Sequence, residues 1–374
     1  MKIAIVQPGG IGPSDDPRVI PCNLTLIERL VRLGHEVHAF ALNGPASRRW
    51  SLFGATIHSN SRRPAGAWTL ASIIAEQRRG RFGAIHAFGT RSGSVGALAA
   101  RLFDAPLVLT LGGGELVSHP ALAFGDQRSL RGRIGLRLAA RTAAAVTTQS
   151  GFMARLAAAR GIQARVVTHG VDLERWPVRP ARPRISGEPL RLLQVGGLTG
   201  VKDQMTLLRA MAILKQAGLA CELEIIGEGS LAPTIHRAAV NLALGSMVSF
   251  SGVMVQAELR PRFERADILV VTSVHESGPV VALEAAVAGV PTVGTQVGHL
   301  SDWAPQAAVA VAVGDAQALA DAILALAADE PRRLRLAAEA QQIAVREDAD
   351  HTAGVMDQIY RTVTQAAPAR TIRD

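Results

Sequence analysis

Apolar and polar residues alternate along the first half of the chain in the pattern of strands that are joined by helices. The run "KIAIVQ" at residues 2–7 predicts a first buried strand. In "NLTLIERLVRLG" apolar residues recur every three or four positions, which predicts a helix near 22–33 that Gly34 ends. The later runs "EVHAFAL", "AIHAF", "APLVLTL" and "AAAVTTQ" predict further strands. Strands that alternate with helices form a parallel sheet with helices on both faces.

A segment without apolar periodicity, "RWPVRPARPRISGEP" at residues 175–189, is rich in proline and arginine and predicts a linker. After it the strands "LRLLQV", "CELEIIG", "MVSFSG" and "DILVVTS" alternate with helices expected from about 203, from about 231 and near 256–265. We therefore expect two α/β domains, at residues 1–178 and 187–350. Ligands of such sheets bind beyond the carboxyl ends of the strands, so the cleft between two facing domains is the expected site.

Composition fits this organisation. A chain of 374 residues with 48% hydrophobic and 19% charged residues is long enough for two globular domains. The first strand has only four apolar residues between Lys2 and Gln7, too few for a secretory signal, and no apolar run is long enough to span a bilayer. Cys22 and Cys221 are the only cysteines, which gives no disulfide framework. The expected location is the cytosol.

Positive charge is concentrated in the first half of the chain. Residues 1–187 carry 25 lysines and arginines against 10 acidic residues, whereas residues 188–374 carry 15 against 21. This asymmetry indicates an anionic partner for the first half, either nucleic acid or an anionic membrane surface. A general bias toward arginine is the alternative, but it would affect both halves. No aromatic stacking platform appears, so nucleic acid is not expected.

One basic helix could meet such a surface. The segment "RSLRGRIGLRLAAR" (128–141) places Leu130, Ile134 and Leu138 on one stripe and Arg133, Arg137 and Arg141 on an adjoining one. This pattern is typical of a helix at an anionic membrane surface on the cytosolic face of the inner membrane. An ordinary amphipathic helix, with its leucines in the core and a charged rim, explains the pattern equally well.

Two glutamates surround a predicted helix start in "HESGPVVALEAAVAGVPTV" (275–293). Pro279 fits the first helical position, which puts Glu276 on the strand-to-helix loop and Glu284 about a turn and a half into the helix. Each glutamate alone has an ordinary explanation, as a partner of the helix dipole or as a solvated side chain. The apolar neighbours of Glu284 weigh against a solvated position.

Between the two glutamates lies a predicted anion site. The first peptide N–H groups of the helix, around Val280 and Val281, lack intrahelical partners and carry partial positive charge, so they can bind phosphate. A carboxylate before this site and another behind it could hold a nucleotide-sugar, with Glu276 at the sugar and Glu284 at the ribose hydroxyls.

The segment "ESGPVVALEAAVAGVPTV" resembles the E-x7-E motif of retaining glycosyltransferases of family 4, which have the GT-B fold. Further segments are similar to the family in the same order, over about 360 residues. They are "GGIG", "RLGHEVHAF", "THGVD" (168–172), "VGGLTGVKDQMTLLRA", "LEIIGEGSL" and "VSFSGVM". The resemblance implies two Rossmann-like doubly wound parallel-sheet domains that face across a cleft. It also implies a carboxyl-terminal helix, about 351–374, that packs back on the first domain.

The resemblance assigns roles to individual residues. Lys202 matches the lysine that neutralises the leaving diphosphate, and Glu276 and Glu284 match the glutamates at the sugar and at the ribose. The expected donor-binding residues are Gly9, Gly10, Gly12, Lys202, Ser277, Gly278, Pro279, Val280, Val281 and Glu284. Such enzymes take a nucleotide-sugar as substrate and usually need no metal, so no cofactor is expected.

Two departures from the family pattern stand out. The usual arginine of "GRL" is Gly197 here, which removes one of two phosphate cations. The frequent histidine after the fourth or fifth strand is replaced by glycines in "LTLGGGELVSHP". His119, a few residues on, is one acceptor-side candidate, and an ordinary loop histidine is the alternative. His86, at the end of "AIHAF", is the other candidate, and a packed strand-end histidine explains it equally well.

These features predict a retaining glycosyltransferase. It would move a hexose-type sugar from a UDP- or GDP-sugar to a glycan or a lipid-linked acceptor, in cell-surface polysaccharide or glycolipid synthesis. Gly197 and the absent histidine leave open a nucleotide-sugar-binding protein of weakened activity, which the retained Glu276, Lys202 and Glu284 oppose. A sugar-nucleotide epimerase on the same fold is a third possibility, distinguished by product that forms without an acceptor.

Overall fold

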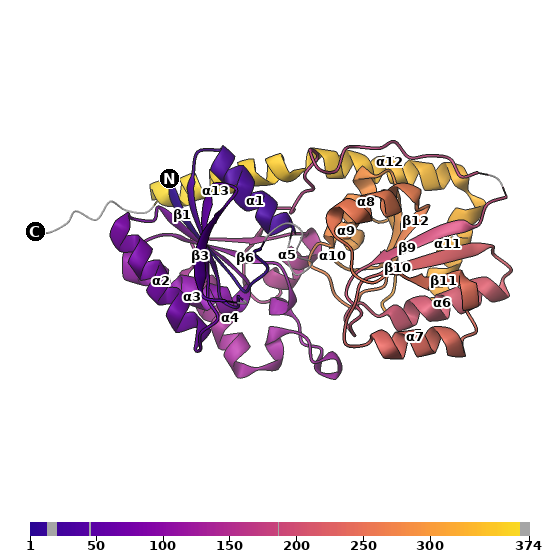
Figure 1. Cartoon of the computed structure of the whole chain (residues 1–374), viewed down its shortest axis with the longest axis horizontal. Helices are drawn as coiled ribbons and strands as arrows, with labels where there is room; N and C mark the ends of the chain where they lie inside the picture. The colour runs from indigo at the N-terminus through magenta and orange to yellow at the C-terminus, as the bar shows by residue number, and fades with distance from the viewer. Residues whose placement is uncertain (13–20, 45, 186, 367–374) are drawn as a thin grey trace, which may run out of the picture. The chain divides into compact units, whose positions relative to one another are not determined.

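A computed structural model describes residues 1–12, 21–44, 46–185 and 187–366 (Figure 1). The chain folds as two compact units, each built around its own sheet. Unit 1 contains Met1–His169 and the stretch from Ala349 onward, and unit 2 contains Gly170–Asp348. Within the described residues, no helix combines the length and apolar character needed to cross a bilayer.

Unit 1 has an eight-stranded sheet in the order β3-β4-β2-β1-β5-β6-β7-β8. Every pairing is parallel except that of β3 with β4. The strands are β1 (Lys2–Gln7), β2 (Glu36–Ala41), β3 (Arg48–Leu52), β4 (Ala55–Ser59), β5 (Ala84–Phe88), β6 (Leu107–Leu111), β7 (Ala145–Thr148) and β8 (Arg165–Val166). The sequence pattern did not predict β3 and β4, because the arginine-rich β3 lies at the sheet edge with most of its residues exposed or half-buried.

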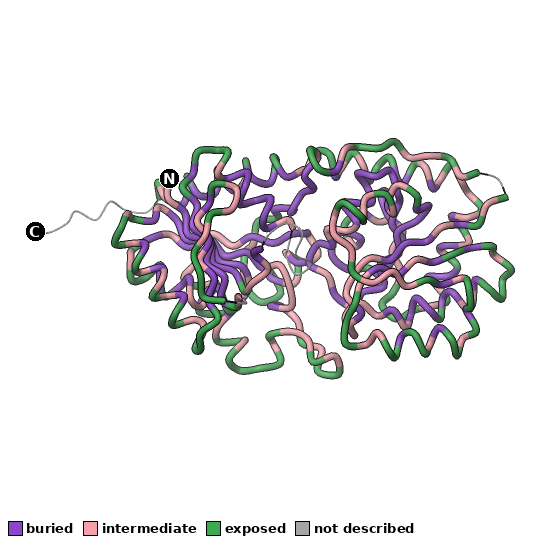
Figure 2. The backbone as a smooth tube through the Cα atoms, viewed as in Figure 1, coloured by how far each residue is buried: buried purple, intermediate pink, exposed green. Residues whose placement is uncertain are grey.

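Helices cover the sheet of unit 1, and three short 3-10 helices lie between β6 and α4. The α-helices are α1 (Pro21–Arg32), α2 (Ala65–Arg79), α3 (Gly89–Phe103), α4 (Leu130–Thr142), α5 (Gly151–Ala158) and α13 (Ala349–Ala366). The 3-10 helices are η1 (Gly114–Leu116), η2 (Pro120–Leu122) and η3 (Asp126–Arg128). The strands are largely buried while the outer faces of the helices are exposed (Figure 2).

The last described helix, α13, completes the core of unit 1. It packs on α1 and β5, beside α1 in Figure 1. Its apolar face, which includes Met356, Ile359 and Tyr360, belongs to the same buried cluster as Ile3 and Ile27. The carboxyl-terminal helix was expected over about 351–374. The structure describes it up to Ala366, and residues 367–374 lie outside the described residues.

Unit 2 has a six-stranded, all-parallel sheet in the order β11-β10-β9-β12-β13-β14. This is the order 3-2-1-4-5-6 of a doubly wound nucleotide-binding sheet, in which the strand order reverses between β9 and β12. The strands are β9 (Leu190–Val195), β10 (Cys221–Ile226), β11 (Val248–Phe250), β12 (Ile268–Val271), β13 (Thr292–Thr295) and β14 (Ala308–Val311).

The helices of unit 2 are α6 (Gln204–Gln216), α7 (Ala232–Asn241), α8 (Gln256–Arg265), α9 (Val280–Val287), α10 (Gly298–Trp303), α11 (Ala316–Ala328) and α12 (Glu330–Arg346), with the 3-10 helix η4 (Gly245–Met247). The sequence pattern predicted α6 to α9 but not α10, α11 and α12. Helix α9 is almost entirely apolar and is buried, in agreement with its Ala- and Val-rich sequence.

The proline- and arginine-rich segment 175–189 has no helix or strand in its described residues, but it is fixed to unit 2. The fully buried Arg333 donates hydrogen bonds to the Arg182 carbonyl at 2.6 Å and to the Asp267 carbonyl at 3.2 Å. Trp176 is buried in the core of unit 2. The transition between the units therefore lies at residues 169–170, earlier than the expected end of the first domain at 178.

Candidate functional site

Two loops of unit 2 meet at the carboxyl end of its sheet, at the switch between β9 and β12. The loop after β9 carries Lys202, and the loop after β12 carries Glu276. The Val274 amide donates to the Val201 carbonyl at 2.7 Å, and the Thr272 hydroxyl donates to the Lys202 carbonyl at 2.9 Å. These bonds fix the two loops against each other at the edge where doubly wound sheets bind their ligands.

The side chains of Lys202 and Glu276 form an ion pair. The Lys202 ammonium lies 2.5 Å from Glu276 Oε1, and the Ser273 hydroxyl donates to the same oxygen at 2.6 Å. The side chains are 29% and 13% exposed, so the pair is partly open to solvent. The structure thus brings together two of the sequence-predicted residues, separated by 74 positions in the chain.

Beyond Glu276 the chain enters α9. Pro279, which was expected to be the first helical residue, is the N-cap residue with φ −64°, and α9 starts one position later at Val280. Gly298 at the start of α10 lies against this loop, because a Cβ there would come 2.8 Å from Pro279 Cδ and 3.1 Å from Glu276 Cβ. Its φ of +51° adds a second reason for glycine. The position of Glu276 therefore depends on a close approach by α10.

Glu284 is buried in the middle of α9, at 5% exposure. Burial raises the pKa of its carboxyl to about 7, and a 3.4 Å hydrogen bond from the Gln256 amide opposes that rise. Within the described residues this carboxyl pairs with no cation. A buried carboxyl with spare acceptor capacity can accept hydrogen bonds from ligand hydroxyl groups.

Sequence reasoning missed His299, the second residue of α10. Its ring stacks on Trp303 at 5.3 Å between centroids, and its Nε2 is buried without a hydrogen-bond partner among the described residues. Burial lowers its pKa to about 4, against the opposing charges of Asp302, Glu347 and Glu276. The neutral imidazole near Glu276 could have been noticed in "VGHLSD", but a lone histidine on an apolar helix carries little signal.

In unit 1, the glycine-rich turn follows β1. Gly10 has φ +76°, and a Cβ on Gly9 would lie 2.9 Å from the Asn43 carbonyl oxygen, so both positions favour glycine for structural reasons. Gly12 is buried at the end of the described part of this loop. The predicted contact of these glycines with phosphate stays a prediction.

His86 is a packed histidine. It is fully buried on β5, with Nδ1 2.7 Å from the Tyr360 hydroxyl and Nε2 2.7 Å from the Thr110 hydroxyl. Burial lowers the pKa of His86 to about 3. With both ring nitrogens engaged inside the core, His86 cannot reach an acceptor, and the packed alternative holds.

His119 lies half-buried between η1 and η2, with its ring stacked on Phe124 at 6.3 Å. The same region contains Glu115, which sequence reasoning missed. Burial raises the pKa of Glu115 to about 6, while its carboxylate accepts a 2.7 Å bond from the Gly113 amide. The glycines of "LTLGGGELVSHP" thus surround a buried acid, not the histidine that the family pattern favours.

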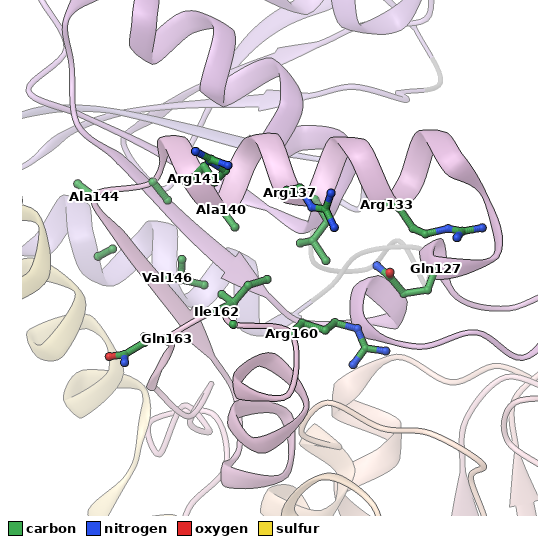
Figure 3. Close-up of a pocket in the computed structure, with 14 residues that line it drawn as sticks. Gln127, Arg133, Arg137, Ala140, Arg141, Ala144, Val146, Arg160, Ile162 and Gln163 are labelled. Atoms are coloured by element: carbon green, nitrogen blue, oxygen red, sulfur yellow. The ribbon is translucent and has the colours of Figure 1, made fainter.

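Helix α4 lines a cavity of about 580 Å³ in unit 1 (Figure 3). Arg133, Arg137 and Arg141 border it from α4, and Arg160 borders it from the segment after α5. Within the described residues the three α4 arginines make no ion pair with a carboxylate, and no acidic residue lines the cavity. This cavity is an electropositive site of its own.

The leucine stripe of α4 is exposed, so the interpretation that places it in the core is wrong. Leu130 is 66% exposed, Ile134 58% and Leu138 39%, whereas the buried residues of the helix are Leu136 and Ala139.

Comparisons with known proteins agree with this architecture. Residues 22–175 match the family model described as Glycosyltransferase Family 4, and residues 179–343 match the model described as Glycosyl transferases group 1. A D-inositol 3-phosphate glycosyltransferase from Xylanimonas cellulosilytica is 32% identical over 333 residues, covering 81% of this chain and 78% of that protein. A Mycobacterium tuberculosis glycogen synthase is 27% identical over 293 residues, covering 74% and 70%.

Solved structures share the fold. Sucrose-phosphate synthase from Thermosynechococcus elongatus superposes with a TM-score of 0.81 at 20% identity, covering 98% of this chain and 99% of that one. Anabaena HepE in complex with UDP-glucose superposes with a TM-score of 0.75 at 20% identity, covering 97% and 100%. Sequence relationship, fold and the arrangement of both sheets agree: the chain belongs to glycosyltransferase family 4 and is a glycosyltransferase enzyme of the GT-B fold.

Proposed function

We propose that this glycosyltransferase transfers a hexose from a UDP- or GDP-sugar, with retention of anomeric configuration, to a glycan or lipid-linked acceptor in cell-surface polysaccharide or glycolipid synthesis. The observation that carries the proposal is the Lys202–Glu276 ion pair at the switch point of the unit 2 sheet. HepE and the E. coli trehalose-6-phosphate enzyme were solved with UDP-glucose and UDP-2-fluoro glucose, which makes UDP-sugars the first donors to test.

In the proposed reaction the acceptor hydroxyl oxygen bonds to the anomeric carbon as that carbon's bond to the phosphate oxygen breaks. The hydroxyl proton passes to the departing phosphate oxygen. Lys202 exchanges part of its contact with Glu276 for the diphosphate, and the amides of Val280 and Val281 stabilise the remaining negative charge. This scheme balances charge without a metal ion.

Glu276 and Glu284 have separate tasks in this proposal. Glu276, which is only partly exposed and is oriented by Ser273, hydrogen-bonds the sugar. The carboxyl of Glu284 accepts hydrogen bonds from the ribose hydroxyls, which stabilise the ionised form of a buried acid.

The test is a panel of UDP-, GDP- and ADP-sugars incubated with the protein and candidate acceptors, with the anomeric configuration of the product read by NMR. Slow donor hydrolysis without acceptor, and transfer with retention when acceptor is present, would support the proposal. Glu276→Ala should abolish transfer while nucleotide binding persists. Inverted product, or unchanged turnover of Glu276→Ala, would refute the assigned mechanism.

We also propose that α4 meets an anionic membrane surface, where a lipid-linked acceptor would lie. The support is the exposed stripe of Leu130, Ile134 and Leu138 beside Arg133, Arg137 and Arg141. Cosedimentation with vesicles of anionic lipid should fall when the three arginines are replaced by glutamine. Replacement of Arg131, on the same helix but outside the cavity, is the matched control. Equal binding of both variants would contradict this role.

A further inference from the structure

Three potential metal ligands meet on one side of the unit 1 sheet, away from every residue considered above. They are His38 on β2, His58 on β4 and Glu76 on α2, and their candidate ligand atoms all lie within 4.8 Å of one another. Phe40 pairs with His58 across the β2–β4 register, so His38 and His58 are diagonal neighbours on the face that α2 covers. We call these three residues the histidine cluster.

The distances suit a shared cation. His38 Nδ1 lies 3.2 Å from His58 Nε2, close to the separation of about 3.3 Å expected for two nitrogens on one tetrahedral zinc ion. Glu76 Oε2 lies 3.8 Å from His38 Nδ1 and would have to move inward by roughly half an ångström to complete a third bond. His38 and Glu76 are buried, and His58 is half-buried.

The surrounding groups orient these ligands as the second shell of a metal site does. Glu36 Oε1 lies 2.9 Å from His38 Nε2, which places the ring proton on that nitrogen and leaves the Nδ1 lone pair facing the cluster. Arg79 binds Glu76 through Oε1 at 2.5 Å and Arg49 approaches the same oxygen at 3.6 Å, so Oε2 faces the histidines.

The three side chains offer a mixed donor set. Two imidazole nitrogens and one carboxylate oxygen, all within 4.8 Å of one another, match the nitrogen and oxygen ligands that zinc takes in proteins.

We propose that the histidine cluster binds one zinc ion, which joins β2, β4 and α2 at the edge of the unit 1 sheet. The ion has a structural role and is separate from sugar transfer. It fastens the short β3–β4 edge, which carries few buried residues of its own, to a helix of the core.

The test uses the full chain without a histidine tag, dialysed against zinc and then gel-filtered, with zinc measured by mass spectrometry. One zinc per chain is expected. At a free zinc concentration about a hundredfold above the dissociation constant, the thermal unfolding midpoint should rise by about 5–10 °C. Cobalt substitution should give the visible absorption of a tetrahedral site.

Variants separate the cluster from surface binding. Glu36→Gln changes an exposed residue, so the fold is retained, and it should weaken zinc binding about 10- to 100-fold. His58→Asn should weaken it further. His236→Asn removes an exposed histidine whose ring lies 4.1 Å from that of Phe250 at a tilt of 52°, and this variant should bind zinc as the parent does.

Retention of one zinc by the parent chain, with losses in Glu36→Gln and His58→Asn only, would support the proposal. A parent chain that retains no zinc would overturn it and leave the cluster as a hydrogen-bonded network. Equal zinc content in the parent and in His58→Asn would also overturn it.

Discussion

Replacing Lys202 by alanine removes the ammonium that faces Glu276 and, in the proposed reaction, the donor diphosphate. A charge-assisted hydrogen bond to phosphate contributes about 1.5–3 kcal/mol. Lys202 and Glu276 are partly exposed, so water screens the attraction between the ammonium and a negative charge placed beside it. For two unit charges about 4 Å apart, this Coulomb energy is about 1 kcal/mol in water and about 4 kcal/mol near a protein surface. We therefore expect nucleoside diphosphate to bind about 10- to 150-fold more weakly.

Glu276 makes the loss larger in the single variant, because its carboxylate remains without its cation and repels the phosphate. The double variant Lys202→Ala with Glu276→Ala should therefore bind diphosphate more tightly than Lys202→Ala alone. The difference between the two measures the coupling of the pair. Folding stability should change little, because a partly exposed ion pair contributes about 0–1 kcal/mol.

Titration calorimetry with UDP, GDP and the corresponding nucleosides, at one low salt concentration, measures these effects. The nucleosides lack phosphate, so their affinity should be unchanged. Lys215→Ala is the matched control, because Lys215 is an exposed lysine of the same unit that donates to the Ala243 carbonyl. If Lys202→Ala binds diphosphate within twofold of the parent while Lys215→Ala does too, the assignment of Lys202 to phosphate is wrong.

Three further changes give independent tests. The pKa of Glu284, about 7 against 4.5 for the ordinary group, means that the folded chain keeps a proton which the unfolded chain loses, so stability falls as pH rises from 4.5 to 7. Glu284→Gln has no carboxyl to titrate, so it should remove up to about 3 kcal/mol of this pH-dependent loss of stability. In urea unfolding, the midpoint of the variant should no longer drop between pH 5 and pH 8. An unchanged drop would refute the raised pKa. A Cβ on Gly197 meets nothing closer than 3.5 Å, so Gly197→Arg should fit and tighten diphosphate binding about tenfold, and calorimetry showing no gain contradicts a phosphate near that position. Tyr360→Phe leaves the buried His86 Nδ1 without its hydrogen-bond partner, so the free energy of unfolding measured with urea should fall by about 1–2 kcal/mol. An unchanged free energy of unfolding would contradict the assignment of His86 as a packed core histidine.

The sequence predicted most of the fold because its elements are local. Apolar runs and helix periodicity placed α1, β9 and α8 to within a residue or two. Parallel pairing was expected as well, but the pattern did not predict the strand order, in which β1 pairs with β5 and β9 pairs with β12. The edge strand β3 was missed because none of its residues is buried. Its neighbour β4 was missed although its burial alternates, because a run of five residues is too short to stand out.

The candidate site was predictable where a motif carried it. Lys202 and Glu276 follow two strands that turned out to be neighbours, so their meeting depends only on sheet order. His299 and Glu115 were missed because only the packing of the folded chain buries them. The histidine cluster was missed because it joins three separate elements. His86 was assigned a functional role that its sequence position made plausible. In the structure, its ring instead forms a hydrogen bond with the hydroxyl of Tyr360, 274 positions away.

Because α13 belongs to unit 1, the unit that is synthesised first is the last to complete its fold. Unit 2 is continuous and can close as soon as Asp348 has left the ribosome. Unit 1 is synthesised first, yet its core lacks Met356, Ile359 and Tyr360 until α13 emerges. A chain cut before Ala349 would leave α1 with an uncovered apolar face, so the amino-terminal half is prone to aggregation whenever translation stops early.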